Sequence, residues 1–544
     1  MKILLKEGKI YDGTGNKPYI GSILIEDDRI VCVKDSIEEE CADEVISLKG
    51  LSVSSGFIDA HSHNDWYAIK QNPLPYFEPF IRQGITTFIT GNCGLSVVGF
   101  EKDCLYVKQL GGGLFSFHET TGEYGTISEF FDAIHKKIPG NLAILIGHCT
   151  VRKGLIGTSN QPLTLEEEKN MLFLLEEALK QGACGISLGL MYEPGLYADT
   201  LELKKVAKLC MKFNRPLTVH PRANSSVSMA YPQLFGRSHL LRALDELVEI
   251  AREMNHTKDE FSNEKNQFKL QYSHAIFVGR SSFRDKDEFL SIMHQLRKEG
   301  IDIGFDIYHE EMGVSVITVI LPTWYQALSK RHRKRPWNKI KLWLLCKVTS
   351  KLLGFGFDDI EIAYIGKDGQ EFEGKTVHQI ARERNQSDLD TYLFLCEKSN
   401  FKGRVNMGPY STKDIIYELA KENDCIYMTD AWVEEEGVQN PAIYDCFPKF
   451  LQSSLRNKTN TVEQTIRKMT GQVADRFSLK DRGYIKEGNF ADITVFNEEI
   501  LKNETPDQNK SFGIEKVFIN GKQVIEKDTM NEVLLQNAGY AIRS

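Results

Sequence analysis

The chain has 544 residues, of which 41% are hydrophobic, and its formal net charge is −8 at pH 7. This length exceeds one ordinary domain and supports a large buried core, while the acidic balance argues against general nucleic-acid binding, which favours a basic surface. No signal peptide or membrane-spanning run is visible and the eleven cysteines include no C-x-x-C pair, so we expect reduced thiols and a cytoplasmic protein.

Both ends of the chain carry short apolar, β-branched runs separated by turn signals. Such runs occur at residues 2–5, 21–25 and 29–33 near the start, and at residues 491–496 and 516–525 near the end. This pattern is typical of antiparallel strands. Because neither end alone has enough strands to bury a core, we predict that residues 1–54 and 485–544 pack together into one small β domain.

Eight short apolar runs lie between these ends, and most are followed by a helical pattern. The runs are residues 56–59, 86–90, 142–146, 185–190, 216–219, 269–272, 301–307 and 425–429. The clearest helical patterns cover residues 163–179, 200–213, 239–254 and 287–298. Strands that alternate with helices indicate parallel β/α units, and eight such units favour a closed barrel over residues 55–484. The alternative is an open doubly wound sheet, but no Gly-x-Gly-x-x-Gly follows the first strand.

In a barrel of this kind, functional residues lie where strands end and the following loops begin. Seven of the eight runs are followed there by residue types that bind metals or line such sites: His61 and His63, Cys93, His148, Tyr192, His220, His274 and Asp430. His61 and His63 are two residues apart. On extended backbone both rings therefore point to the same side, as a chelating site requires.

Histidines at three strand ends, one cysteine and one aspartate could hold one or two zinc ions, because zinc favours nitrogen and sulfur ligands. The metal would activate a water molecule, and Asp430 could take its proton and pass it to a leaving nitrogen. Cys93 could instead be a small buried thiol, and Asp430 could be a helix N-cap. We expect His148 to be structural rather than a ligand, and we assign no role to His309.

The segment from residue 310 to about residue 400 contains no obvious barrel strand and is too long for an ordinary connection. Within it, residues 312–357 lack Asp and Glu, yet a basic run at residues 330–335 is followed by four more lysines and interleaved apolar residues. This pattern predicts a lid-like helical insertion with a solvated basic face. Alternatively, residues 330–353 form an amphipathic element that touches an anionic membrane or guides an apolar, negatively charged substrate. Contact with nucleic acid is a third interpretation.

Short motifs at the strand ends and near the end of the chain form an ordered set, at residues 56–63, 91–94, 185–195, 219–222, 272–274, 467–471, 481–483 and 488–492. This set resembles the amidohydrolase superfamily and, within it, the D-aminoacylase (N-acyl-D-amino-acid deacylase) family, over nearly the whole chain. The resemblance implies a distorted (β/α)8 TIM barrel beside a β-sandwich built from both termini. It also implies zinc-dependent hydrolysis of the amide bond of a small-molecule N-acyl amino acid.

In this family a cysteine replaces the metal-bridging carboxylated lysine found elsewhere in the superfamily, and here that cysteine is Cys93. The resemblance implies a role for each candidate residue: a tight zinc on Cys93, His220 and His274, a second, weaker site facing His61 and His63, an acid/base at Asp430, and pocket positions for Tyr192 and Arg222. These roles are expectations that the geometry of a folded chain has to meet.

Two departures from the family pattern affect the substrate. The family often places a lysine two residues after the sixth-strand histidine, where this chain has Ile276, and an arginine in a triplet after the catalytic aspartate, where it has Ala442. Losing both cations matters because a substrate carboxylate pairs strongly with Arg or Lys. Either Arg280, Arg222 or a residue of the insertion substitutes, or the substrate is not a simple N-acetyl-D-amino acid.

Two other functions stay open at this point. The first is a cyclic-amide hydrolase of the dihydroorotase or hydantoinase type, although such enzymes usually carry the bridging lysine. The second is a non-catalytic barrel scaffold without metal, against which the complete set of metal-binding residue types argues.

Overall fold

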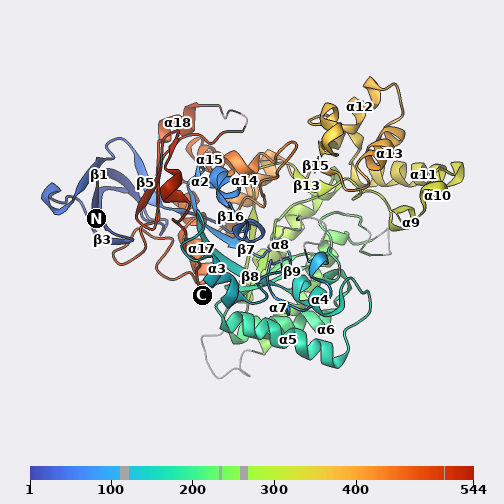
Figure 1. The fold of residues 1–544 in the computed structure, drawn as a ribbon, viewed down its shortest axis with the longest axis horizontal. Coiled ribbons are helices and arrows are strands. Elements are labelled where there is room, and N and C mark those ends of the chain that lie inside the picture. The colour runs from blue at the N-terminus through green and yellow to red at the C-terminus, as the bar shows by residue number, and fades with distance from the viewer. Residues whose placement is uncertain are drawn as a thin grey trace.

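The computed structural model describes residues 1–110, 115, 122–228, 230–231, 236–257, 267–326, 328–505, 507 and 509–544 (Figure 1). Its centre is a sheet of eight parallel strands in the order β16-β12-β11-β10-β9-β8-β7-β6. In chain order these strands are β6 (Phe57–Asp59), β7 (Ile85–Thr90), β8 (Asn141–Gly147), β9 (Gly185–Gly189), β10 (Pro216–His220), β11 (Lys269–Tyr272), β12 (Asp302–Ile307) and β16 (Cys425–Tyr427). Each strand overlaps one of the eight runs predicted from the sequence.

The two outer strands of this sheet, β6 and β16, meet just beyond their ends. The Ala60 amide donates a hydrogen bond to the Tyr427 carbonyl at 3.3 Å, and the Asp430 amide donates to the His61 carbonyl at 3.0 Å. These bonds nearly close the sheet into a barrel. The predicted α/β fold with a distorted TIM barrel is therefore confirmed. The sequential strand order is incompatible with a doubly wound sheet, in which the order reverses at a switch point.

Helices follow most of the barrel strands and lie around them (Figure 1). They are α1 (Asp65–Ala68), α2 (Leu74–Ile81), α3 (Ile127–Ile134), α4 (His148–Ile156), α5 (Leu165–Lys180), α6 (Thr200–Lys212), α7 (His239–His256), α8 (Lys286–Lys298), α14 (Lys413–Lys421), α15 (Ala442–Leu455), α16 (Val462–Lys468) and α17 (Gly471–Phe477). In α5, Thr164 and Glu167 form a capping box, and Met171, Leu175 and Leu179 are buried at helical spacing. The four predicted helices begin and end within two residues of their observed bounds.

The two chain ends form a second sheet of nine strands, drawn on the left in Figure 1. Its strands are β1 (Lys2–Tyr11), β2 (Tyr19–Glu26), β3 (Arg29–Lys34), β4 (Glu44–Ser47), β5 (Ser52–Ser55), β17 (Ile493–Phe496), β18 (Ile514–Ile519), β19 (Lys522–Glu526) and β20 (Thr529–Met530). The ends join where β5 pairs antiparallel with β17, with Ser54 opposite Thr494. The predicted terminal β domain is therefore present, while its limits at residues 54 and 485 stay a prediction. Helices α18 (Glu498–Asn503) and α19 (Glu532–Leu535) accompany its later strands.

The terminal sheet is attached to the amino-terminal end of the barrel strands. Asn141, the first residue of β8, donates to Asp492 Oδ1 at 3.0 Å and accepts from Asn520 Nδ2 at 2.7 Å, and all three side chains are buried. The chain end returns to the same strand, where the Leu142 amide donates to the Tyr540 carbonyl at 2.9 Å. The terminal sheet thus leaves the opposite end of the barrel free for a site.

The insertion after β12 has its own hydrophobic core. Its strands β13 (Gly313–Val316), β14 (Ile360–Tyr364) and β15 (Arg404–Met407) form a sheet in the order β13-β15-β14. Its helices are α9 (Thr323–Gln326), α10 (Lys330–Arg333), α11 (Pro336–Leu353), α12 (Val377–Glu383) and α13 (Asp388–Lys398). Ile317, Leu342 and Tyr392 pack in a cluster separate from the barrel core. The insertion is therefore a small subdomain that projects from the barrel (Figure 1), and its third strand lies beyond the predicted limit near residue 400.

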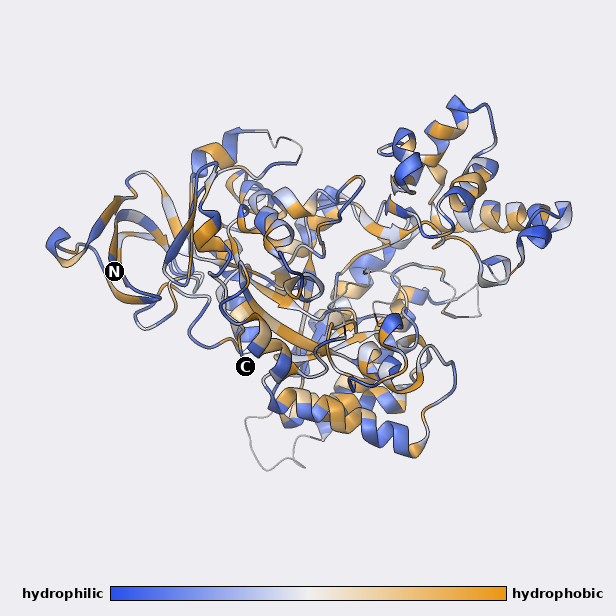
Figure 2. Cartoon of the chain, in the orientation of Figure 1, coloured by the Kyte–Doolittle hydropathy of each residue, from blue (hydrophilic) through white to orange (hydrophobic). Residues whose placement is uncertain are grey.

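Hydropathy follows this architecture: the barrel strands are largely hydrophobic, whereas the helices carry both hydrophobic and hydrophilic residues (Figure 2). None of the helices in the described part of the chain is both long and apolar enough to cross a membrane. All eleven cysteines are free thiols.

Candidate metal centre

The first strand positions two histidines. Beyond β6, the Asp59 carboxylate accepts hydrogen bonds from the His61 amide at 3.2 Å, the Thr429 amide at 2.9 Å and the Thr429 hydroxyl at 2.6 Å. These bonds tie the end of β6 to the end of β16, from which Asp430 follows. Burial raises the pKa of Asp59 to about 7, so this carboxyl is part of a dry, tightly bonded framework beneath the histidines.

The turn after β7 presents Cys93. Cys93 has a φ of +55°, and its neighbour Gly94 donates its amide to the Ser187 hydroxyl at 3.0 Å. A Cβ atom at Gly91, whose φ is +73°, would lie 2.1 Å from the Leu145 carbonyl oxygen. Glycine is therefore required for the turn to pack against β8 while the thiol points into the barrel mouth.

Three imidazole nitrogens surround the Cys93 sulfur. Sγ lies 3.3 Å from His61 Nε2, 3.5 Å from His220 Nδ1 and 3.6 Å from His274 Nε2. All four side chains are buried. A thiol has one hydrogen and can satisfy only one of these nitrogens. Imidazole nitrogens around one sulfur are instead the kind of donors that zinc favours.

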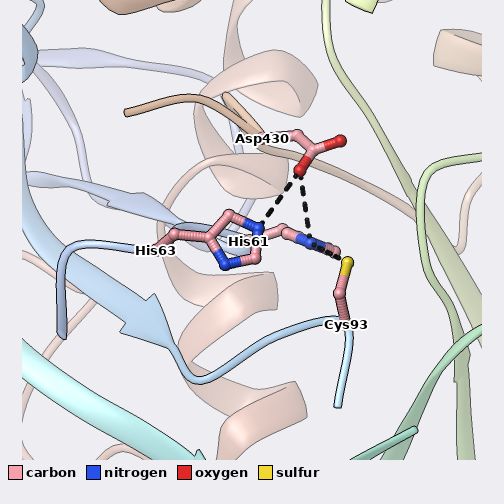
Figure 3. A group of neighbouring side chains, drawn as sticks. All are labelled: His61, His63, Cys93 and Asp430. Atoms are coloured by element: carbon pink, nitrogen blue, oxygen red, sulfur yellow. Dashed lines mark hydrogen bonds and ion pairs between the residues drawn. The ribbon is translucent and has the colours of Figure 1, made fainter. Parts of the chain in front are cut away.

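Asp430 completes the cluster (Figure 3). Its Oδ1 lies 3.4 Å from His61 Nε2 and 3.5 Å from His63 Nε2. No described helix begins at residue 430, since the next helix, α15, starts at Ala442; the helix N-cap interpretation of Asp430 is therefore wrong. Burial opposes the charged carboxylate, but its interactions with the imidazoles of His61, His63 and His274 hold the pKa of Asp430 below its usual value.

The cluster contains two overlapping sets of metal-binding atoms. One is His61, His63, Cys93 and Asp430, and the other is Cys93, His220 and His274; within each set the candidate ligand atoms lie within 4.8 Å of one another. Cys93 belongs to both sets. Burial raises the pKa of its thiol to about 11 even though His61 opposes this shift, so a bound cation is what would hold the thiolate form.

Asp306, which the sequence patterns did not single out, supports two of the histidines. Its carboxylate accepts from the His274 amide at 2.6 Å and from Gln271 Nε2 at 3.0 Å, and its Oδ1 lies 3.7 Å from His61 Nδ1. Asp306 is buried on β12. The sequence did contain a signal for Asp306: it is a carboxylate within an apolar strand, one residue before that strand ends.

Aromatic side chains line the cluster. The Tyr192 ring lies 4.8 Å from the His220 ring, between centroids, so the predicted pocket residue is at the site. The His63 ring contacts Phe115 and Trp432, at centroid distances of 4.9 and 5.5 Å. The mouth of the barrel is therefore partly apolar, which suits an uncharged group beside the metal-binding atoms.

The two predicted arginines have other partners. The Arg222 guanidinium pairs with Glu246 at 2.7 Å and donates to the Ala198 carbonyl at 2.6 Å. The Arg280 guanidinium forms two hydrogen bonds with Asp359 of the insertion, at 2.8 and 2.9 Å. The structure thus brings the thiol, the four imidazoles and the Asp430 carboxylate together, but engages both arginines in ion pairs.

Two further histidines considered from the sequence, His148 and His309, lie in other networks. His148 Nε2 pairs with Glu202 at 2.7 Å in a buried contact, which agrees with the structural role expected for it. His309 Nε2 contacts the Ser453 hydroxyl at 2.9 Å.

Known proteins resemble the chain over its whole length, although no protein-family model matches it. The chain is 25% identical to the D-aminoacylase of Alcaligenes xylosoxydans xylosoxydans, covering 99% of this chain and 97% of that protein. It is 23% identical to the N-acyl-D-glutamate deacylase of the same organism, over 96% and 93% of the two chains. The solved N-acyl-D-glutamate deacylase from Bordetella bronchiseptica, complexed with zinc and a phosphonate mimic of the tetrahedral intermediate, has a TM-score of 0.77 at 21% identity, covering 100% of this chain and 99% of that one.

Proposed function

We propose that this chain, a member of the D-aminoacylase family of the amidohydrolase superfamily, is a metal-dependent hydrolase that cleaves the amide bond of an N-acyl compound. The observation that carries the proposal is the convergence of one thiol, four imidazoles and one carboxylate at the carboxyl end of the barrel strands. Because the relatives are named for N-acyl-D-amino acids, such an amino acid or a related N-acyl compound is the proposed substrate class.

Zinc is the proposed metal, because a thiolate with imidazoles favours it over harder cations. Cys93, His220 and His274 would hold one tightly bound ion, and His61 and His63 would face a second, weaker site. When bound, zinc supplies an activated water and polarises the substrate carbonyl. The shared position of Cys93 in both sets of donors supports this arrangement.

Asp430 is the proposed general base and then general acid. One of its oxygens faces His61 and His63, and its lowered pKa keeps the carboxylate ionised, which is the form that a general base requires. It takes a proton from the attacking water and delivers it to the nitrogen that leaves as the amine. Tyr192 forms one wall of the pocket in which this exchange takes place.

The amine side of the substrate is where this chain should differ from its relatives. Position 276 is isoleucine and position 442 is alanine, while Arg222 and Arg280 are already paired with Glu246 and Asp359. A free substrate carboxylate would have to displace one of these paired carboxylates, which is unfavourable for the largely buried Arg222–Glu246 pair. We therefore propose an N-acyl compound whose amine side does not depend on an arginine clamp.

A hydrolysis screen tests the proposal. Zinc-loaded protein is assayed against N-acyl D- and L-amino acids with short and long acyl chains, N-acyl amines, and a hydantoin and cyclic imide panel, with Asp430→Asn as the control. We expect amine release from linear N-acyl compounds and none from the control. Exclusive opening of cyclic amides would assign the chain to the dihydroorotase or hydantoinase type, and protein purified without chelators that contained no transition metal would point to a non-catalytic scaffold.

Partners and compartment are further proposals. A small-molecule N-acyl compound is the expected ligand, and no nucleic-acid partner is expected for a chain with net charge −8. Eleven free thiols support a cytoplasmic location. We also propose that residues 330–353 contact an anionic membrane surface, because exposed tryptophans and cations share this segment.

A further inference from the structure

The insertion carries a concentration of positive charge that the hydrolase proposal does not use. Residues 312–357 contain nine Lys or Arg and no Asp or Glu, in a chain whose net charge is −8. Most of these cations lie on α10 and α11 or between them. Among the described residues, Lys339 is the one member of this group that forms an ion pair, with Asp390 of α13. The segment therefore presents a field of opposite sign to the rest of the molecule.

Helix α11 is apolar on two opposite faces. Leu342 and Cys346 point inwards and pack in the core of the insertion. On the other side, Trp337, Leu344 and Val348 are 75%, 51% and 53% exposed. Their spacing of seven and then four residues places them in one row along the helix. A soluble helix normally has a polar outer face, so this row requires an explanation.

Cations flank the exposed row. Lys341, Lys347 and Lys351 are exposed and, at helical spacing, lie on the same outward half of α11 as the apolar side chains. Trp343 is 48% exposed, and the Lys347 ammonium lies 4.9 Å from the centre of its indole ring. We define the basic apolar face as Trp337, Trp343, Leu344 and Val348 together with these three lysines. Figure 2 shows the helix at the outer edge of the molecule.

We propose that the basic apolar face docks on the surface of a membrane that contains anionic phospholipid. Tryptophans and lysines beside aliphatic side chains are the composition of helices that lie in the headgroup region, where the lysine stems reach past the apolar row to the phosphates. The cations match anionic headgroups in charge. A nucleic acid would match the cations too, but it would leave Leu344 and Val348 uncovered, because aliphatic side chains provide no stacking surface for bases.

The basic apolar face is linked to the loop that follows His274. The carboxyl end of α11 contacts the turn that follows the sixth barrel strand, where Arg280 donates to the Gly354 carbonyl at 2.8 Å. The same guanidinium pairs with Asp359, and Arg280 is six residues beyond His274. A membrane bound by α11 would therefore hold the barrel through the loop that carries a metal-binding histidine. The docking itself does not depend on the hydrolase proposal.

Vesicle flotation tests the docking. Full-length protein is mixed with vesicles of phosphatidylcholine alone or with 30% phosphatidylglycerol, at low and high salt. Two variants change the face: Trp337→Ala/Leu344→Ala/Val348→Ala and Lys341→Gln/Lys347→Gln/Lys351→Gln. The matched control is Leu165→Ala/Phe173→Ala/Leu201→Ala, which removes side chains that are 88%, 61% and 66% exposed on α5 and α6. Thermal unfolding confirms that each variant is folded.

We expect binding to anionic vesicles that weakens with salt and is unchanged in the control. The lysine variant should lose about 100-fold in affinity, since each lysine near an anionic surface contributes roughly fivefold. The apolar variant should lose at least about tenfold. In the unmodified protein, brominated lipids should quench tryptophan fluorescence, because Trp337 and Trp343 are highly exposed whereas Trp66 and Trp432 are buried.

Three outcomes would overturn the proposal. The first is a failure of lipid-dependent binding. Either the protein binds neutral and anionic vesicles equally, or it does not bind at low salt and brominated lipids do not quench its tryptophan fluorescence. The second is tighter binding to RNA or DNA than to anionic vesicles at equal salt. The third is a dimer in solution that the apolar variant converts to a monomer, which would make the face a contact between copies of the chain. None of these results bears on amide hydrolysis, so they are distinguishable from failure of the hydrolase proposal.

Discussion

Replacing Asp306 by asparagine should weaken the metal centre without removing a ligand. Asp306 is buried, accepts from the His274 amide at 2.6 Å and from Gln271 Nε2 at 3.0 Å, and lies 3.7 Å from His61 Nδ1. Asparagine has the same shape, but one of its two terminal atoms is a donor. It can keep the bond from His274 or the bond from Gln271, and it loses the negative charge with which Asp306 helps to raise the pKa of His61.

The size of the effect follows from these contacts. A hydrogen bond to a charged group contributes about 1.5–3 kcal/mol, and one such bond is lost. Loss of a group that orients a metal-binding histidine typically weakens metal affinity by about 10–100-fold, which corresponds to about 1.4–2.7 kcal/mol. The two estimates agree, so we expect the tightly bound metal of Asp306→Asn to dissociate at 10–100-fold lower concentrations of a competing chelator.

The control for this experiment lies on the same strand. Asp302 is also on β12, but it is at the opposite end of the barrel and pairs with Arg476 at 2.6 Å. Asp302→Asn should leave metal affinity unchanged. Affinity is measured by competition with a chromogenic chelator, and metal content by elemental analysis. If the two variants retained metal equally well, Asp306 would not position the histidines, and the reasoning from its contacts would fail.

Three further predictions follow from the same geometry. Asp430→Asn should lower kcat by about 10²–10⁴ at near-normal metal content; loss of the metal instead would make Asp430 mainly a ligand. Cys93→Ser should weaken zinc binding, and an unchanged affinity would remove the thiolate from the site. Burial opposes protonation of His148, but hydrogen bonds and charge from Cys149 and Glu202 raise its pKa to about 9. Protonated His148 should then stabilise the fold by roughly 3 kcal/mol below its unfolded pKa of about 6.5, and that stability is lost as the pH rises through 9. Urea unfolding between pH 6 and pH 10 should show this decline in the unmodified protein and a flatter profile in Glu202→Gln.

Local patterns in the sequence predict the barrel well because each of its strands is a self-contained apolar run and seven of the eight runs are followed by a candidate functional residue. The insertion is different. Its strands β13, β14 and β15 are separated by 43 and 39 residues, and they pair only through contacts across the subdomain, which periodicity does not encode. Its helix α11 was recognisable because eighteen residues of helical spacing suffice to identify a helix.

Local sequence patterns also do not show which charged side chains pair with one another. Arg280 looked available to a substrate, yet its carboxylate partner Asp359 is 79 residues away in the chain. Arg222 meets Glu246 at a separation of 24 residues. Asp306 was overlooked for the converse reason: its partners, the His274 amide and Gln271, come from a neighbouring strand. A side chain's charge can be read from the sequence, but whether that charge is already neutralised depends on the fold.

The backbone at the candidate metal centre adopts an uncommon conformation at three of the site residues. Cys93, His274 and Asp430 have φ values of +55°, +37° and +47°, a region that costs non-glycine residues about 1–3 kcal/mol each. Two of the three are fixed by their own amides: His274 donates to Asp306 and Asp430 donates to the His61 carbonyl. Cys93 stands between the bonded Asn92 and Gly94. Because strain of this kind persists only where surrounding bonds over-determine the conformation, its presence at three strand ends marks residues whose positions the fold maintains at the expense of its own stability.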